Sequence, residues 1–253
     1  MYDSLLEYYE EFFPVEQSRI DFIGASADEL RKRSGSSGLI HVLDIGCATG
    51  STIFRLTPLG MDLTGIDSNE TMIRCAARRN HEWRSTTRFF HMDMMEAGKY
   101  FRGESFDMIL CLGNTLVHLP DAETIRTFIV QLHSLLKKGG CFIFQLINYD
   151  RILDRHIASL PALKSPRAGM TRTYTETEDG HILFEITVND SGGSPVFSDK
   201  TLLYPLRVSE LKAMLEDAGF SEVRMLSDFT GNPLEEDSLA VTGTAWATPS
   251  KPS

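Results

Sequence analysis

Apolar runs and amphipathic stretches alternate along the chain from residue 39 onward. In residues 39–56 an apolar, β-branched run ends at Asp44, a turn of small residues follows, and an amphipathic stretch begins at about Ser51. That order predicts a strand, a loop and a helix. The same order predicts further strands at residues 61–67, 88–92, 107–112 and 141–148, with helices starting near Ser68 and Asp121. Helices that separate successive strands are typical of an α/β, Rossmann-like sheet with helices on both faces.

A different pattern precedes this region. Residues 2–33 favour helix, interrupted at Pro14, which must break or start a helix. We expect residues 1–38 to form a helical lid. Tyr8 and Tyr9 are its candidate ligand contacts, with packing as the alternative.

The strand and helix order also breaks after residue 148. Two alternating runs flank Asp179 and Gly180, which is a strong hairpin signal. We therefore expect residues 149–206 to form an antiparallel β insert that shapes a pocket.

The helical order returns near the end of the chain. The pattern predicts a helix capped by Ser209 or its neighbour and ended by Gly219, followed by two strands. The helix that starts near Asp121 is expected to end in a glycine cap at residues 137–140. The predicted core therefore comprises residues 39–148 and 207–247, with residues 248–253 as a disordered tail.

Composition excludes several classes of protein. The chain has 253 residues, a net charge of −10 and scattered basic residues, which argues against a nucleic-acid or membrane partner. No apolar stretch approaches the roughly 18 residues of a membrane span, so a soluble, cytoplasmic protein is expected. The four cysteines lie far apart with no CxxC pair, so the sequence indicates neither disulfides nor a metal site.

The turn after Asp44 is a candidate cofactor site. Glycines allow close approach of the backbone to a ligand, and the following helix presents free N–H groups. A dinucleotide fingerprint would need glycines where Ala48 and Ser51 stand. The pattern D-x-G-x-x-x-G instead suits a ligand without phosphate, whose amino-acid end meets carbonyls and a carboxylate. An NAD-binding oxidoreductase remains the alternative.

Polar residues follow the other predicted strands. Asp67 suits both hydroxyls of a ribose, although Asp67 or Ser68 could instead cap the next helix. Asp93 with Met94 suits an adenine ring, unless the acid is an ordinary strand-end residue. Asn114 follows the fourth strand. Because parallel strands end at one edge of the sheet, we expect these side chains to converge.

Several motifs together resemble one family. VLDIGCATG, LTGID, DMM at 93–95, CLGNTLVHL, INYDRIL and LLYPLRVSELKAMLEDAGF are similar to the glycine and sarcosine N-methyltransferase branch of the class I S-adenosylmethionine-dependent methyltransferases. The resemblance covers residues from about 39 to 230. It implies a seven-stranded sheet whose last strand is antiparallel, S-adenosyl-L-methionine as cofactor and S-adenosyl-L-homocysteine as product.

The resemblance also implies site residues. The acceptor is expected near Asn114, Tyr149 and Tyr204, which are the candidate catalytic residues. His118 falls on the family's histidine after LGN, where simple packing is an equal alternative. The full set of candidate cofactor contacts is Tyr9, Asp44, Gly46, Cys47, Ala48, Gly50, Asp67, Ser68, Asp93, Met94, Leu112, Asn114 and His118.

One departure from the family bears on the acceptor. Glycine-methylating relatives carry an arginine immediately before NYD, whereas this chain has Ile147. An apolar side chain cannot pair with a carboxylate, so the resemblance implies a small-molecule acceptor, an amine other than glycine. An O-methyltransferase and a cofactor-binding module without turnover remain alternatives. The oligomeric state stays open, with a homodimer as one option.

Overall fold

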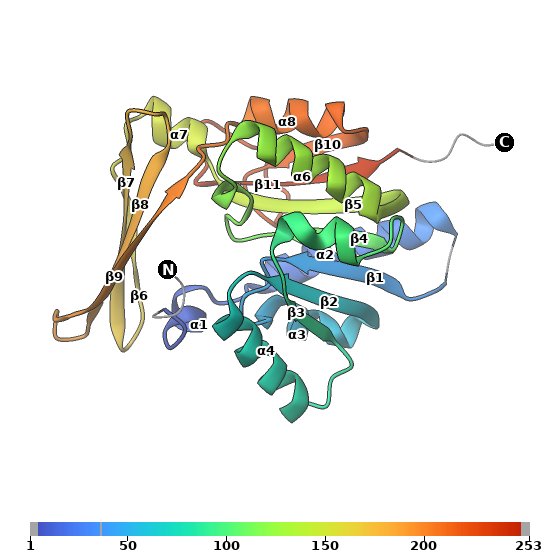
Figure 1. The fold of residues 1–253 in the computed structure, drawn as a ribbon, viewed down its shortest axis with the longest axis horizontal. Helices are drawn as coiled ribbons and strands as arrows, with labels where there is room; N and C mark the ends of the chain where they lie inside the picture. The colour runs from blue at the N-terminus through green and yellow to red at the C-terminus, as the bar shows by residue number, and fades with distance from the viewer. Residues whose placement is uncertain (1–4, 36, 249–253) are drawn as a thin grey trace.

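Seven strands form the main sheet of the computed structural model, which describes residues 5–35 and 37–248. Their order is β10-β11-β5-β4-β1-β2-β3, and the last strand, β11, runs antiparallel to both neighbours (Figure 1). This confirms the α/β class and the antiparallel last strand. The strands are β1 Ile40–Ile45, β2 Met61–Asp67, β3 Arg88–His91, β4 Phe106–Cys111, β5 Leu136–Ile147, β10 Phe220–Leu226 and β11 Ala240–Ala247.

Helices cover both faces of this sheet and bury its central strands on both sides. Leu43 of β1 packs into one apolar cluster with helices α6 and α8, while its neighbour Val42 packs into a second cluster with α2 and α3. The helices are α1 Tyr9–Phe12, α2 Gln17–Ser34, α3 Ser51–Leu56, α4 Glu70–Glu82, α5 Ala97–Tyr100, α6 Ala122–Leu135, α7 Tyr149–Asp154 and α8 Val208–Asp217, with 3₁₀ turns η1 Thr57–Leu59, η2 Met94–Glu96 and η3 Leu116–His118.

A second, antiparallel sheet of four strands stands beside the main one, at the left of Figure 1. The Asp179-Gly180 turn joins β7 to β8, and Glu176 pairs with Ile182. The hairpin prediction is therefore confirmed. The segment after residue 148 differs from the expectation at its start, because α7 and an additional strand precede the hairpin. The strands are β6 Ser159–Lys164, β7 Ala168–Glu176, β8 Ile182–Asp190 and β9 Pro195–Leu203.

The end of α6 and the caps of α4 and α8 differ from those considered in the sequence analysis. Helix α6 ends at Leu135 and residues 137–140 belong to β5, since Leu136 pairs with Phe106 and Lys137 forms an ion pair with Asp107 at 2.8 Å. The cap of α4 is Asn69, whose side chain accepts from the Met72 amide.

Helix α8 begins one residue before Ser209, and its first amide is satisfied from elsewhere in the fold. The Val208 N–H donates to Asp150 Oδ2 across 2.9 Å. Arg207 occupies the cap position without a side-chain capping bond. A distant carboxylate thus replaces the local cap, which a local pattern does not reveal. Of the predicted tail, residues 249–253 lie outside the described residues.

Candidate active site

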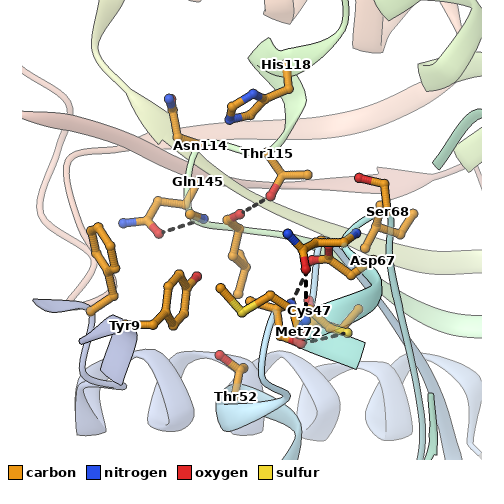
Figure 2. A pocket seen from close by; sticks show the side chains of 18 of the residues that line it. Tyr9, Cys47, Thr52, Asp67, Ser68, Met72, Asn114, Thr115, His118 and Gln145 are labelled. Atoms are coloured by element: carbon orange, nitrogen blue, oxygen red, sulfur yellow. Dashed lines mark hydrogen bonds between the residues drawn. The ribbon is translucent and has the colours of Figure 1, made fainter. Parts of the chain in front are cut away.

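One cavity of about 540 Å³ lies at the carboxyl ends of the central strands. In Figure 2, Tyr9 and Thr52 lie across the cavity from Asn114 and His118, with Asp67 at one side. Its walls come from the loop after β1, the ends of β2, β4 and β5, the N-terminal segment and the second sheet. The strand ends therefore converge as predicted, and the cavity they form is closed on its other side by the second sheet.

The loop after β1 needs its first glycine for two reasons. Gly46 has a φ of 74°, and a Cβ there would lie 2.4 Å from Thr115 Oγ1. Two residues later Ala48 adopts a left-handed φ of 48°, which an L residue rarely does. The Ala48 amide donates to Asp67 Oδ2 across 2.9 Å. This bond helps to hold the loop in its strained form.

Asp67 connects three parts of the site. Its Oδ2 atom accepts from Ala48, and its Oδ1 atom accepts from the Asn69 amide at 2.8 Å, just before α4. Burial raises the pKa of the Asp67 carboxyl, and these two backbone bonds oppose that effect. Each carboxylate oxygen keeps a further lone pair that can accept from a ligand hydroxyl.

Asp44 and Arg19 form the charged floor of the cavity. Asp44 is only 3% exposed, and burial raises its pKa to about 7, an effect that Arg19 opposes and Asp67 increases. The Arg19 Nη1 atom donates to Thr52 Oγ1 at 3.4 Å, while its buried Nε has no partner among the described residues. The pair offers one group for an ammonium and one for a carboxylate.

The Asn114 side chain is fixed by two neighbours. Its Oδ1 accepts from the Ile147 amide at 3.0 Å, and its Nδ2 donates to the Tyr149 hydroxyl at 3.0 Å. Asn114 itself has a φ of 73°, a conformation that asparagine tolerates better than most residues. Tyr149 is fully buried and does not line the cavity, so it positions Asn114. Beside them His118 lines the cavity, and burial lowers its pKa to about 4, so the ring is neutral near pH 7.

Helix α1 covers the loop after β1. The Glu10 carboxylate accepts from Thr49 Oγ1 at 3.0 Å and from Ser51 Oγ at 2.7 Å, and it also pairs with Arg79. From the turn between β6 and β7, Arg167 ion-pairs with the carboxylates of two residues of this segment, Glu7 and Glu11. The N-terminal segment is thereby tied to both halves of the molecule.

Residues of the second sheet form the remaining wall. They come from β7, β8 and β9, and three of them pair in one row across the sheet, Tyr174 with Phe184 and Phe184 with Thr201. Arg172 pairs with Ile186 in the same way. All five residues line the cavity: Arg172, Tyr174, Phe184, Ile186 and Thr201.

Most of the predicted cofactor contacts line the cavity: Tyr9, Asp44, Gly46, Cys47, Ala48, Asp67, Ser68, Asp93, Met94, Leu112, Asn114 and His118. Gly50 does not line it. Gly50 caps α3 with a φ of 76°, and a Cβ there would lie 2.8 Å from the Phe89 ring. Its role in this structure is therefore close packing.

Two tyrosines considered from the sequence also lie elsewhere. Tyr204 donates its hydroxyl to Glu210 at 2.9 Å, and Tyr8 packs under the Arg167 guanidinium at 4.8 Å. Neither lines the cavity, so the structure does not bring Tyr204 to the predicted acceptor position. Ile147, in contrast, does line the cavity.

The sequence analysis missed several lining residues. Arg19 had a recognisable signal. It lies four residues before Ile23 on the buried face of α2, where a charged side chain is unusual and indicates a functional role. The others had no local signal because distant segments bring them together: Thr52, Met72, Thr115, Gln145 and the wall residues of the second sheet.

Comparisons with known proteins agree with this geometry. Residues 42–140 match a sequence-family model described as a methyltransferase domain. Over 238 residues the chain is 26% identical to a glycine/sarcosine N-methyltransferase from Aphanothece halophytica, a match that covers 91% of this chain and 86% of that protein.

Solved structures share the fold. An S-adenosylmethionine-dependent methyltransferase from Clostridium acetobutylicum has a TM-score of 0.78 at 16% identity, covering 98% of this chain and 99% of that one. An amino pentose methyltransferase from Micromonospora echinaspora, solved with S-adenosylmethionine bound, has a TM-score of 0.68 at 19% identity, covering 98% of each chain.

The fold, the loop after β1 and the family match together define a methyltransferase. The chain belongs to the class I S-adenosylmethionine-dependent methyltransferases, and its cofactor is S-adenosyl-L-methionine. This decides against the NAD-dependent oxidoreductase considered from the sequence. None of the helices in residues 5–35 and 37–248 is long and apolar enough to cross a membrane.

The cavity fits this cofactor. The free lone pairs of Asp67 suit ribose hydroxyls, and the unpartnered Nε of Arg19 beside Asp44 suits the charged amino-acid end. Gly46 and Thr115 both line the cavity, and a Cβ at position 46 would clash with Thr115.

Proposed function

We propose that this enzyme transfers the methyl group of S-adenosylmethionine to the amine of a small molecule other than glycine. The observation that carries the proposal is the cavity in which the strand-end carboxylates face the wall of the second sheet. The glycine/sarcosine and amino pentose methyltransferases among the similar proteins both support an amine acceptor.

We assign the cofactor to the strand ends of the main sheet. Asp67 would hold the ribose hydroxyls, Asp93 and Met94 the adenine, and Asp44 with Arg19 the amino-acid end. The N-terminal segment would cover the cofactor through Tyr9. The cofactor supplies a sulfonium-bound methyl group that needs no further activation by the protein.

The chain's own contribution is then to place the acceptor. Asn114 lines the cavity with an amide that Tyr149 and the Ile147 backbone hold still, so it can orient a nitrogen lone pair. The surrounding apolar side chains disfavour a charged ammonium and so favour the neutral, reactive amine. Ile147 leaves the strand end without the cation that glycine-methylating relatives have there.

A library of small amines and phenols, incubated with the protein and S-adenosylmethionine and read by mass spectrometry, tests this proposal. We expect a mass gain of one methyl group on at least one amine and no useful activity on glycine. Tyr149→Phe should lower turnover through Asn114 while S-adenosylhomocysteine affinity stays unchanged. Methylation of phenols alone, or efficient methylation of glycine, would contradict the proposal.

A further inference from the structure

Arg172 is a cation on the cavity wall without an acidic partner. Its Nη2 atom donates to the Pro161 carbonyl at 2.9 Å, which anchors one edge of the guanidinium. Its Nε atom is buried and has no hydrogen-bond partner among the described residues, and no ion pair joins it to a described carboxylate. Burial lowers the pKa of this guanidinium; the neighbouring Tyr174 opposes that effect, and no carboxylate contributes to it.

Tyr174 adds a second unpaired donor on the same face of β7. It lies two residues after Arg172, so both side chains point to the same side of the strand. Tyr174 is only 4% exposed, and its hydroxyl has no partner among the described residues. Burial raises its pKa to about 12, so the hydroxyl keeps its proton and can donate. Buried donors without partners are costly and therefore need an explanation.

Other cations near the site are neutralised. Arg167 pairs with Glu7 and Glu11, and Arg207 pairs with Asp150 and Asp154. Arg19, the other arginine on the cavity, lies close enough to Asp44 to influence its pKa. Arg172 thus differs from each of them in having no carboxylate beside it.

The neighbours of these two donors are apolar. Ile186 and Phe184 of β8 lie directly opposite Arg172 and Tyr174 in the ladder and also line the cavity. A ligand that reaches the donors therefore passes along a hydrocarbon surface. That arrangement suits a molecule with an apolar body and an anionic end.

We propose that Arg172 and Tyr174 form a subsite for the carboxylate of the acceptor, and that this acceptor is an amino acid with a longer carbon chain between amine and carboxylate than glycine has. The inference rests on the proposed function, amine methylation. A guanidinium presents parallel donors that match a carboxylate, and the tyrosine hydroxyl adds a third. With Ile147 at the end of β5, the anion site lies on the second sheet instead of the main one.

The reaction at such an acceptor balances without any further reagent. The nitrogen lone pair forms a bond to the methyl carbon, and the carbon–sulfur bond breaks with its electron pair remaining on sulfur. The methylated ammonium then loses its proton to water.

Two matched substrate series test the subsite. One is glycine, 3-aminopropanoate, 4-aminobutanoate and 5-aminopentanoate, and the other is the corresponding alkylamines without carboxylate. The wild type should prefer at least one longer amino acid over its alkylamine by about tenfold or more in kcat/KM, as expected for a charge-assisted pair. Arg172→Gln should abolish that preference by raising KM for the amino acid far more than KM for its alkylamine. Tyr174→Phe should reduce it a few-fold.

Arg155→Gln is the matched control. The substitution removes one positive charge, as Arg172→Gln does. Arg155 lies at the end of α7, pairs with Asp237 and does not line the cavity. It should keep the wild-type preference. S-adenosylhomocysteine affinity of Arg172→Gln should equal that of the wild type, which separates loss of the subsite from misfolding.

A binding measurement distinguishes failure of this inference from failure of the proposed function. Calorimetry of 4-aminobutanoate and 5-aminopentanoate against the protein saturated with S-adenosylhomocysteine should detect binding that Arg172→Gln loses. If that binding is found while no amine is methylated, the subsite stands and amine methylation fails. If neither amino acid binds, or if Arg172→Gln keeps the carboxylate preference, the inference is wrong.

Discussion

The amide of Ala48 donates to the carboxylate of Asp67 across 2.9 Å, and this bond links the loop after β1 to the end of β2. Gly46, Ala48 and Gly50 of this loop all have left-handed φ values, and that conformation is least favourable for Ala48 because it has a side chain. The carboxylate therefore stabilises the loop and, by our proposal, also holds the ribose. A substitution at Asp67 should show both effects.

We expect Asp67→Asn to weaken S-adenosylhomocysteine binding by about 2 kcal/mol, because hydrogen bonds to a charged group are lost. It should also lower the melting temperature of the ligand-free protein, since an amide nitrogen cannot accept the bond from Ala48 or Asn69. Calorimetry and thermal melts measure the two effects. Unchanged affinity in a folded variant would remove the ribose assignment.

The pKa of Asp44, about 7, makes cofactor binding depend on pH. An ammonium binds the ionised carboxylate, so at lower pH binding must first remove a proton. Affinity for S-adenosylhomocysteine should thus fall about tenfold from about pH 8 to about pH 6. Asp44→Asn should bind more weakly and with a flat profile over that range. A wild-type profile that is equally flat would contradict the assignment.

The same shift predicts an opposite effect on stability. Because the folded-state pKa of Asp44 lies above its ordinary value, its contribution to stability is full at low pH and is lost as pH rises through about 7. Asp44→Asn should therefore melt at a higher temperature than the wild type at about pH 8. The difference should shrink toward about pH 5, which thermal melts at both values would show.

Gly46→Ala should destabilise the protein more than the conformation of the residue alone explains. Both Gly46 and Gly60 have left-handed φ values, 74° and 66°, but only a Cβ at position 46 meets another atom within 4 Å. Gly60→Ala should cost about 1 kcal/mol from conformation, and Gly46→Ala about 1 to 3 kcal/mol more from the clash with Thr115. Denaturant unfolding of both variants gives the comparison. If both substitutions lowered the free energy of unfolding equally, the loop after β1 would have to move enough to relieve the clash with Thr115.

Ile147→Arg should create measurable glycine binding or methylation, which we expect the wild type to lack. Ile147 lines the cavity at the end of β5, beside Asn114. The gain should be small, because a grafted arginine lacks surrounding groups that orient it and must lose its water. Glycine methylation rates of the two proteins measure it. Robust activity of the unmodified protein on glycine would refute the argument from Ile147.

The sequence predicted the main sheet well because each strand and helix carries its own apolar period. It failed where a distant partner decides the local structure. Residues 137–140 look like a helix end, yet they belong to β5, whose Leu136 pairs with Phe106 of β4 while the Lys137 side chain forms an ion pair with Asp107. Ser209 looks like a cap, yet Asp150 satisfies the first amide of α8.

The site divides in the same way. Asp44, Asp67 and Asn114 lie at or just after the ends of apolar strands, so their convergence could be predicted from the order of the elements. Arg172 could not be assigned, because on β7 it is one of several polar residues and only the packing of the second sheet turns it toward the cavity. Gly50 shows the reverse case, a motif glycine that serves packing.

Helix α1 is tied on one side to the loop after β1 through Glu10 and on the other to the second sheet through Arg167. If the N-terminal segment covers the cofactor, as we propose, cofactor exchange breaks these contacts, whereas an acceptor that enters along the second sheet need not break the Glu10 bonds. We therefore expect an ordered kinetic scheme in which the cofactor arrives first and its product leaves last. The side chains of Glu10, Glu7 and Arg167 are about half exposed or more. Dissolved salt therefore screens the ion pairs of Glu10 with Arg79 and of Glu7 with Arg167. The rate of product release should rise with ionic strength.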